Sequence, residues 1–164
     1  MTAKLTHLDQ QDRLHMVDVG LKDESQRLAR VHGEIHMQET TLELITTSQV
    51  AKGNVLEAAR LAGIMAAKRT GELIPLCHPL NLTAVELDFH LAKNYIRVEA
   101  EVRIYARTGV EMEAFTAATV ALLTIYDMCK AVDRGMIITQ VQLMEKRGGK
   151  SGTFLRQETT PEST

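Results

Sequence analysis

The sequence predicts an α+β fold, in which helices pack on one face of a mostly antiparallel sheet. Segments in which apolar and polar residues alternate, typical of half-buried strands, occur before, between and after two segments of helical periodicity. The expected order is strand, strand, helix, strand, strand, helix, strand, so strands follow one another in pairs and antiparallel pairing is favoured. The length of 164 residues and the hydrophobic content of 45 % suit a single domain with one core.

The clearest strand covers residues 96–104, where five apolar residues alternate with arginine and glutamate. Residues 85–91 alternate in the same way, and Lys93-Asn94 can form the reversal between the two segments. Together they predict a β-hairpin with one buried and one solvated face.

Three further strands are expected from shorter patterns. Residues 31–37 and 42–46 carry apolar side chains at alternating positions and predict an earlier antiparallel pair. Residues 137–143 predict the fifth strand.

Two helices are predicted between these strands. Asn54 can cap the first, over residues 55–69, whose alanines and single glycine permit close approach to a neighbour. The second covers roughly 110–132, has an apolar stripe, and is followed by Gly135. This order of strands and helices favours a ferredoxin-like arrangement.

Composition limits the class of protein. We expect one domain over residues 1–155, with 1–12 flexible, and a flexible polar tail over 156–164. A net charge of −2 provides no general basic surface for nucleic acid. No apolar run approaches the ~20 residues of a membrane span, and the N-terminus lacks the apolar segment of a signal peptide. We therefore expect a cytoplasmic protein that binds neither nucleic acid nor a membrane.

The two cysteines, Cys77 and Cys129, are too few for a disulfide framework and lack the paired spacing of a zinc site. We expect reduced thiols and no metal site. His78 lies between Pro75 and Pro79, which hold the backbone in an irregular and rigid conformation suited to a ligand contact. Taken alone, His78 is more easily explained as a structural loop histidine, and Cys77 as a small buried hydrophobe.

Asp127 and Lys130 are three residues apart near the end of the second predicted helix, so they lie on one face and can pair. Such a pair is more often a surface salt bridge worth a few tenths of a kcal/mol. Here the pair follows an apolar stretch, where desolvation can shift pKa values.

Glu113 and Asp127 are separated along the same helix. Fourteen residues of straight helix correspond to about 21 Å, with the side chains about 40° apart around the axis. If both contact one small substrate, the helix is broken or each comes from a different subunit. The spacing therefore suggests a site at a subunit interface.

Several basic residues could hold an anion. Lys52 precedes the start of the first predicted helix, where free N–H groups and the helix dipole favour phosphate, and Lys68 lies at its end. Lys146 and Lys150 flank glycines whose backbone can approach a phosphate. This run is not a Walker A loop, because Met144 stands where that motif requires glycine. A solvated, flexible basic tail is an equally good explanation of the run when it is taken alone.

Longer blocks of sequence carry more information than these single residues. Taken in order over about residues 5–152, the chain resembles the cyclic pyranopterin monophosphate synthase family of molybdenum cofactor biosynthesis. The matching blocks are MVDV (16–19), KG (52–53), AGIMAAKRT (62–70), LIPLCHPL (73–80), TGVEMEA (108–114) and LTIYDMCK (123–130).

The resemblance implies a lyase of the phosphorus–oxygen type. Such an enzyme converts a cyclic dihydro-GTP intermediate into cyclic pyranopterin monophosphate and releases pyrophosphate. The resemblance implies no redox cofactor and leaves open a magnesium ion accompanying the triphosphate. It also implies ferredoxin-like subunits in a homohexamer, a trimer of dimers, with the site at a dimer interface.

The resemblance further implies roles for individual residues. The family's catalytic aspartate matches Asp127, which with Lys130 would transfer protons during ring opening and closure, and Lys52 would steady the triphosphate. Lys68 matches a further lysine of the pocket. The family's substrate-binding stretches match Leu76-Cys77-His78 and Met112-Glu113. Lys146 and Lys150 are expected substrate contacts because of the basic run in which they stand.

Two other classes of function deserve comparison. An RNA-binding domain with a ferredoxin-like sheet presents stacking aromatics on its central strands, whereas the best predicted strand here exposes arginine and glutamate. A non-catalytic scaffold of the same pathway would use the small-residue helix for assembly. A scaffold would tolerate the loss of Asp127, and an enzyme would not.

Overall fold

The computed structural model describes residues 7–9 and 11–157, and residues 1–6, 10 and 158–164 lie outside the described part. The elements in chain order are β1 (Ser25–His36), α1 (Glu39–Thr46), α2 (Val55–Ala67), α3 (Thr70–Leu73), β2 (Ala84–Leu91), β3 (Tyr95–Ala106), α4 (Glu111–Cys129), β4 (Ile137–Arg147) and β5 (Phe154–Leu155).

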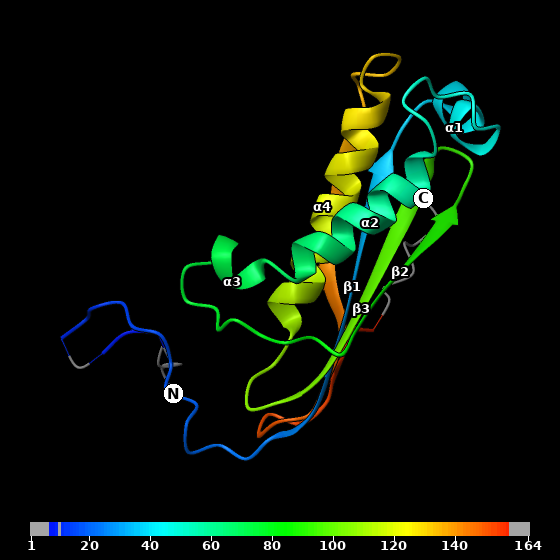
Figure 1. Ribbon diagram of the computed structural model, residues 1–164. Helices are drawn as coiled ribbons and strands as arrows, with labels where there is room; N and C mark the ends of the chain where they lie inside the picture. The colour runs from blue at the N-terminus through cyan, green and yellow to red at the C-terminus, as the bar shows by residue number, and fades with distance from the viewer. Residues whose placement is uncertain (1–6, 10, 158–164) are drawn as a thin grey trace.

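One antiparallel sheet has the strand order β2-β3-β1-β4-β5. Helices α2 and α4 lie together on one face of this sheet (Figure 1). Two strand–helix–strand units make up most of the fold. In β1–α2–β2 the two strands are parallel and β3 lies between them, and in β3–α4–β4 the two strands are parallel and β1 lies between them. This is the arrangement of a ferredoxin-like fold. The α+β, ferredoxin-like prediction is therefore confirmed.

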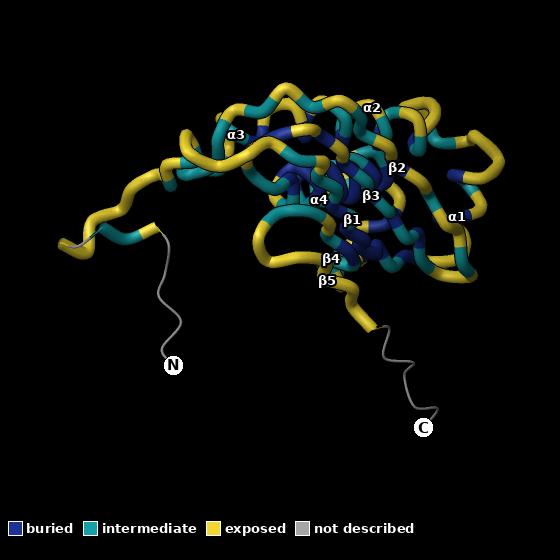
Figure 2. The backbone as a smooth tube through the Cα atoms, turned by 90° about the horizontal axis from the view of Figure 1, so that it is seen from below, coloured by how far each residue is buried: buried dark blue, intermediate teal, exposed yellow. Residues whose placement is uncertain are grey.

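The core lies between the sheet and the two long helices (Figure 2). Alternate residues of β3 from Ile96 to Ala106 are buried, as the apolar alternation predicted. The helices approach each other closely at Gly63, where an added Cβ would lie 2.9 Å from the carbonyl oxygen of Ala117. The small residues of α2 thus pack against α4 within one subunit.

The prediction of a strand over residues 42–46 is wrong, because this segment is helix α1. The buried residues of α1 are Thr41, Leu42 and Ile45, which repeat with helical and not strand spacing. The start of α1 is held from far along the chain, since the carboxylate of Asp133 accepts hydrogen bonds from Gln38 and Thr41. Because the hydrogen-bond acceptor for this helix end lies far along the chain, the residues near Gln38 carry no capping motif that would predict the start of a helix.

The other expected elements are found with shifted ends. Asn54 caps α2 as predicted, with its side-chain oxygen accepting from the N–H of Glu57 at 3.2 Å. Helix α2 ends two residues before the predicted limit, and α4 lies inside the predicted range 110–132. Strand β4 continues to Arg147, beyond the predicted 137–143, because it pairs there with β1 and with the short, unpredicted strand β5.

Most residues of the two ends that we expected to be flexible, 1–12 and 156–164, lie outside the described part of the chain. In the described part, Asp9 organises a turn by accepting hydrogen bonds from the N–H groups of Gln11 and Arg13. Residues 11–24 project from one end of the domain as an extended arm (Figure 1). Among the described helices, α4 alone has the length and hydropathy of a membrane span, and half of that window is buried in the fold, as in a core helix.

Candidate active site

Asp127 lies on the last turn of α4 between two lysines. Lys130 Nζ donates to Asp127 Oδ1 at 2.8 Å, which confirms the pair predicted from their spacing. From the loop before α2, Lys52 Nζ donates to Asp127 Oδ2 at 3.0 Å and to its backbone oxygen at 2.8 Å. One carboxylate therefore aligns two ammonium groups at the C-terminal end of α4.

These contacts set the protonation of the cluster. Hydrogen bonds from Lys130 and then Lys52, together with their positive charges, hold the pKa of Asp127 below its ordinary value. The carboxylate in turn raises the pKa of Lys130. At neutral pH, Asp127 is ionised and Lys130 is protonated, so in this arrangement Lys130 can donate a proton and Asp127 holds it in place.

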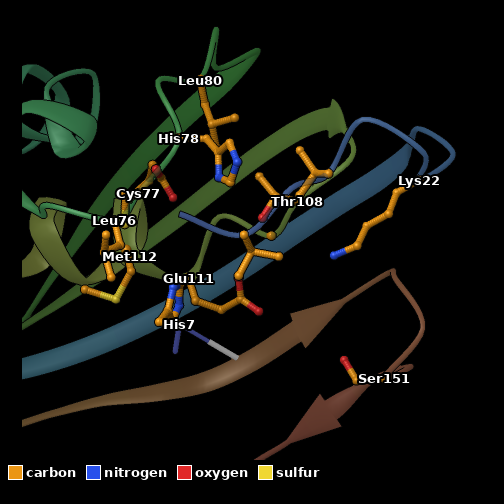
Figure 3. A pocket seen from close by; sticks show the side chains of 14 residues that line it. His7, Lys22, Leu76, Cys77, His78, Leu80, Thr108, Glu111, Met112 and Ser151 are labelled. Carbon is orange, nitrogen blue, oxygen red and sulfur yellow. The ribbon is translucent and has the colours of Figure 1, made fainter. Parts of the chain in front are cut away.

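A hollow of about 490 Å³ lies near the other end of α4. One wall is the loop between α3 and β2, which contributes Leu76, Cys77 and His78, and Met112 and Glu113 from the first turn of α4 also line the hollow. Figure 3 shows these loop side chains on one side of the space, with Lys22 and Ser151 on the other.

The backbone fixes the position of the His78 loop. Cys77 N–H donates to the carbonyl of Ile74 at 3.1 Å, which closes a turn after α3. Gly71 lies directly under the loop, where an added Cβ would stand 3.2 Å from the Cα of Pro79. Close backbone packing and the flanking prolines thus hold His78 at the rim of the hollow.

Glu113 is the most unusual ionisable group of this hollow. Its side chain is buried, with 3 % of the residue exposed, and its pKa is raised to about 7. Burial is the main cause, the negative charge of Glu111 adds to the rise, and a backbone hydrogen bond opposes it. Burial, and secondarily Glu113, raises the pKa of Cys77, which argues against an activated nucleophilic thiol.

A second hollow of about 770 Å³ adjoins the first and is strongly basic. The two share Lys22, Thr108, Gly109, Glu111 and Ser151. The basic residues of the second hollow are Lys22, Arg27, Arg107, Lys146, Arg147 and Lys150.

The end of β4 and the residues that follow it line this basic hollow. Lys146 Nζ bonds to the carbonyl of Gly148 at 3.3 Å and to the hydroxyl of Ser151. Arg27 donates to the carbonyl of Ala106 at 3.2 Å, and within the described part of the chain it pairs with no carboxylate. Sequence reasoning found Lys146 and Lys150 but missed Lys22 and Arg27, which come from a distant segment without a local motif.

Except for Lys68, the predicted site residues therefore fall into two groups at opposite ends of α4. Helix α4 is continuous from Glu111 to Cys129, so Glu113 and Asp127 are about 21 Å apart along its axis. Lys68 is exposed at the end of α2 and lines neither hollow. Among the described residues, no group of three or more His, Cys, Asp or Glu side chains is arranged to hold a metal ion.

Comparisons with known proteins agree with the resemblance. The model of the MoaC family matches residues 16–149. The curated cyclic pyranopterin monophosphate synthase of Desulforapulum autotrophicum is 60 % identical over 152 residues, which cover 92 % of this chain and 93 % of that protein. Proteins of the same name from Thermomicrobium roseum and Desulfitobacterium hafniense are 54 % and 52 % identical, over 95 % and 94 % of this chain and 95 % and 96 % of their own lengths. The chain belongs to the MoaC family.

Proposed function

We propose that this protein forms cyclic pyranopterin monophosphate in molybdenum cofactor biosynthesis. The substrate is the cyclic dihydro-GTP intermediate, and the enzyme is a lyase that releases pyrophosphate. Identity above 50 % to curated synthases over nearly the whole chain is the observation that carries this proposal. Because the rearrangement is redox-neutral, the proposal includes no redox cofactor.

Ring opening and closure require groups that give and take protons. Lys130 is oriented by Asp127, 2.8 Å from its amine, and serves as the proton donor to a ring heteroatom. Lys52 supplies a second positive charge at 3.0 Å from the same carboxylate. When Lys130 has given up its proton, Asp127 and Lys52 still form a neutral pair, so the carboxylate keeps a cationic partner.

The hollow beside the buried Glu113 suits the guanine-derived end of the substrate. A carboxyl group can accept two hydrogen bonds from adjacent N–H groups of such a ring, and burial of Glu113 strengthens that contact once the substrate has displaced water. His78 at the rim orients the same end. Leu76, Cys77 and Met112 supply the apolar contact for the ring faces.

The adjoining basic hollow suits the triphosphate. Lys146 and Lys150 bind its oxygens together with Lys22 and Arg27, which line the same space. Cations in this place stabilise the negative charge that develops on pyrophosphate as it leaves. We keep Lys68 as a predicted substrate contact.

The two clusters form one site if a second subunit completes it. A distance of about 21 Å along one helix prevents Glu113 and Asp127 of the same subunit from contacting one ring system. Leu61, Met65 and Leu123 on the outer sides of α2 and α4 are also exposed, at 59 %, 45 % and 52 %, which suits a covered surface. We propose a cytoplasmic homohexamer, a trimer of dimers, with each site at a dimer interface.

The direct test is to incubate the purified protein with the cyclic dihydro-GTP and to measure pyrophosphate and the fluorescent pterin product. The wild type should form both, and Asp127→Asn should form almost none while keeping the same oligomeric state. A folded wild-type protein that forms neither product from authentic substrate would refute the proposal. Full cellular function of Asp127→Asn would favour the scaffold instead.

A further inference from the structure

Asp133 is a buried carboxylate that lines neither hollow and does not belong to the Asp127 cluster. It follows α4, and 3 % of the residue is exposed. Its carboxylate accepts hydrogen bonds from the N–H of Gln38 at 2.9 Å, the hydroxyl of Thr41 at 3.2 Å and the N–H of Gly135 at 3.0 Å. Asp133 thus ties the start of α1 to the turn that follows α4.

That turn is itself fixed to the end of α4. Asp133 N–H donates to the carbonyl of Cys129 at 3.1 Å, and the hydroxyl of Tyr126 donates to the carbonyl of Arg134 at 3.2 Å. The start of α1 is therefore held at a defined place relative to the last turn of α4, which carries Asp127.

Helix α1 leads into the loop that carries Lys52. This loop contains Ser48 and Gly53 at φ of 56° and 95°, and Lys52 Nζ reaches Asp127 from it. The segment 38–52 is thus attached at both ends to the same end of α4, through Asp133 at its start and through Asp127 at Lys52. Because the Lys52 side chain is 47 % exposed, surrounding packing alone does not fix its position.

We propose that Asp133 is a positioning residue for Lys52, acting through α1. The inference rests on the proposed function, in which the ammonium of Lys52 supports catalysis from beside Asp127. Without the carboxylate of Asp133, the start of α1 moves away from α4, and Lys52 spends less time bonded to Asp127. A mere helix cap would stabilise the fold and leave the Lys52–Asp127 contact unchanged.

Asp133→Asn tests these two roles, because asparagine keeps the size of the side chain but has one acceptor oxygen, which cannot serve Gln38 and Gly135 on its two sides at once. The first measurement is the rate at which Lys52 is acetylated by a dilute reagent, followed by mass spectrometry, with Lys68 in the same molecules as the reference. We expect Lys52 to react several-fold faster in the variant, because its amine is less often held against Asp127 and is more open to the reagent, and we expect Lys68 to react at an unchanged rate.

The second measurement is steady-state kinetics on the intact assembly. Asp133→Asn should lower kcat about tenfold with a smaller change in KM, since Lys52 acts on the bound substrate. Glu39→Gln is the matched control, because this exposed carboxylate in the first turn of α1 pairs with Lys93 at 3.1 Å and does not contact Asp133. Its kcat and its Lys52 labelling should match the wild type.

The results distinguish the inference from the proposed function. Unchanged labelling of Lys52, or faster labelling with unchanged kcat, would overturn the positioning role. A wild type without product formation would refute the proposed function, whereas the labelling would still report on the contact. If Asp133→Asn does not fold, Thr41→Val removes one donor to the same carboxylate, and a smaller change in the same direction is expected.

Discussion

The buried carboxyl of Glu113 predicts a specific dependence of stability on pH. Its pKa is raised from 4.5 to about 7 in the folded protein, chiefly by burial. Below pH 4.5 the group is protonated in the folded and the unfolded chain, so it changes nothing. Between pH 4.5 and 7 the unfolded chain is ionised while the folded protein keeps the proton, so stability falls as the pH rises. Above pH 7 the loss is complete.

The magnitude follows from the shift in pKa. Each pKa unit corresponds to about 1.36 kcal/mol, so ionised Glu113 costs the folded state about 3 kcal/mol above pH 7. Glu113→Gln stays neutral at every pH and avoids this loss. For a chain of this size, each kcal/mol shifts the melting temperature by about 2–4 °C, so the variant should melt about 6–12 °C higher than the wild type at pH 8.

The assay is scanning calorimetry of the wild type and of Glu113→Gln at pH 4.5 and pH 8, on samples of equal protein concentration. The two proteins should melt at nearly the same temperature at pH 4.5 and differ at pH 8. Glu57→Gln is the control, since this carboxylate lies in the first turn of α2 and is 62 % exposed, so its removal should change little at either pH. An equal difference between Glu113→Gln and the wild type at both values would refute the reasoning.

Three further predictions concern packing, capping and charge. Gly63→Ala places a methyl group 2.9 Å from the Ala117 carbonyl oxygen, so it should destabilise the fold by about 1–3 kcal/mol in urea unfolding, and an unchanged midpoint would contradict the close helix contact. Asn54→Ala removes the acceptor for the Glu57 N–H and should lower unfolding free energy by about 1 kcal/mol, whereas Asn54→Ser should retain most of it. Lys146→Ala should raise KM several-fold at low salt and less at high salt, because added ions screen the attraction of Lys146 for phosphate. An equal rise of KM at both salt concentrations would argue against a phosphate contact.

Local signals predicted much of the fold. The alternation along β3 and β2, the small-residue helix α2 and its Asn54 cap all depend on neighbours in sequence, and all are found in the structure. Helix α1 was missed because the group that holds its start, Asp133, is 95 residues from Gln38. Strand β5 is two residues long and exists only through pairing with β4, so no periodicity could reveal it.

The candidate site shows the same limit. The contact of Asp127 with Lys130 follows from helical spacing, but the contact of Lys52 with Asp127 joins residues 75 apart. The basic hollow gains Lys22 and Arg27 from segments far from Lys146 in sequence. The sequence identified chemically suitable residues, whereas their grouping at two ends of α4 required the three-dimensional structure.

Mixing two inactive variants tests most directly whether one site combines both ends of α4 from different subunits. Glu113→Gln and Asp127→Asn are each expected to be inactive, and each is mixed with the other under conditions that exchange subunits. If every site takes Glu113 from one subunit and Asp127 from its partner, random exchange restores about a quarter of the wild-type product formation. If both residues act within one subunit, every site keeps a defect. The proposed function with a shared site therefore predicts recovered activity, and a mixture that exchanges subunits but stays inactive would contradict it.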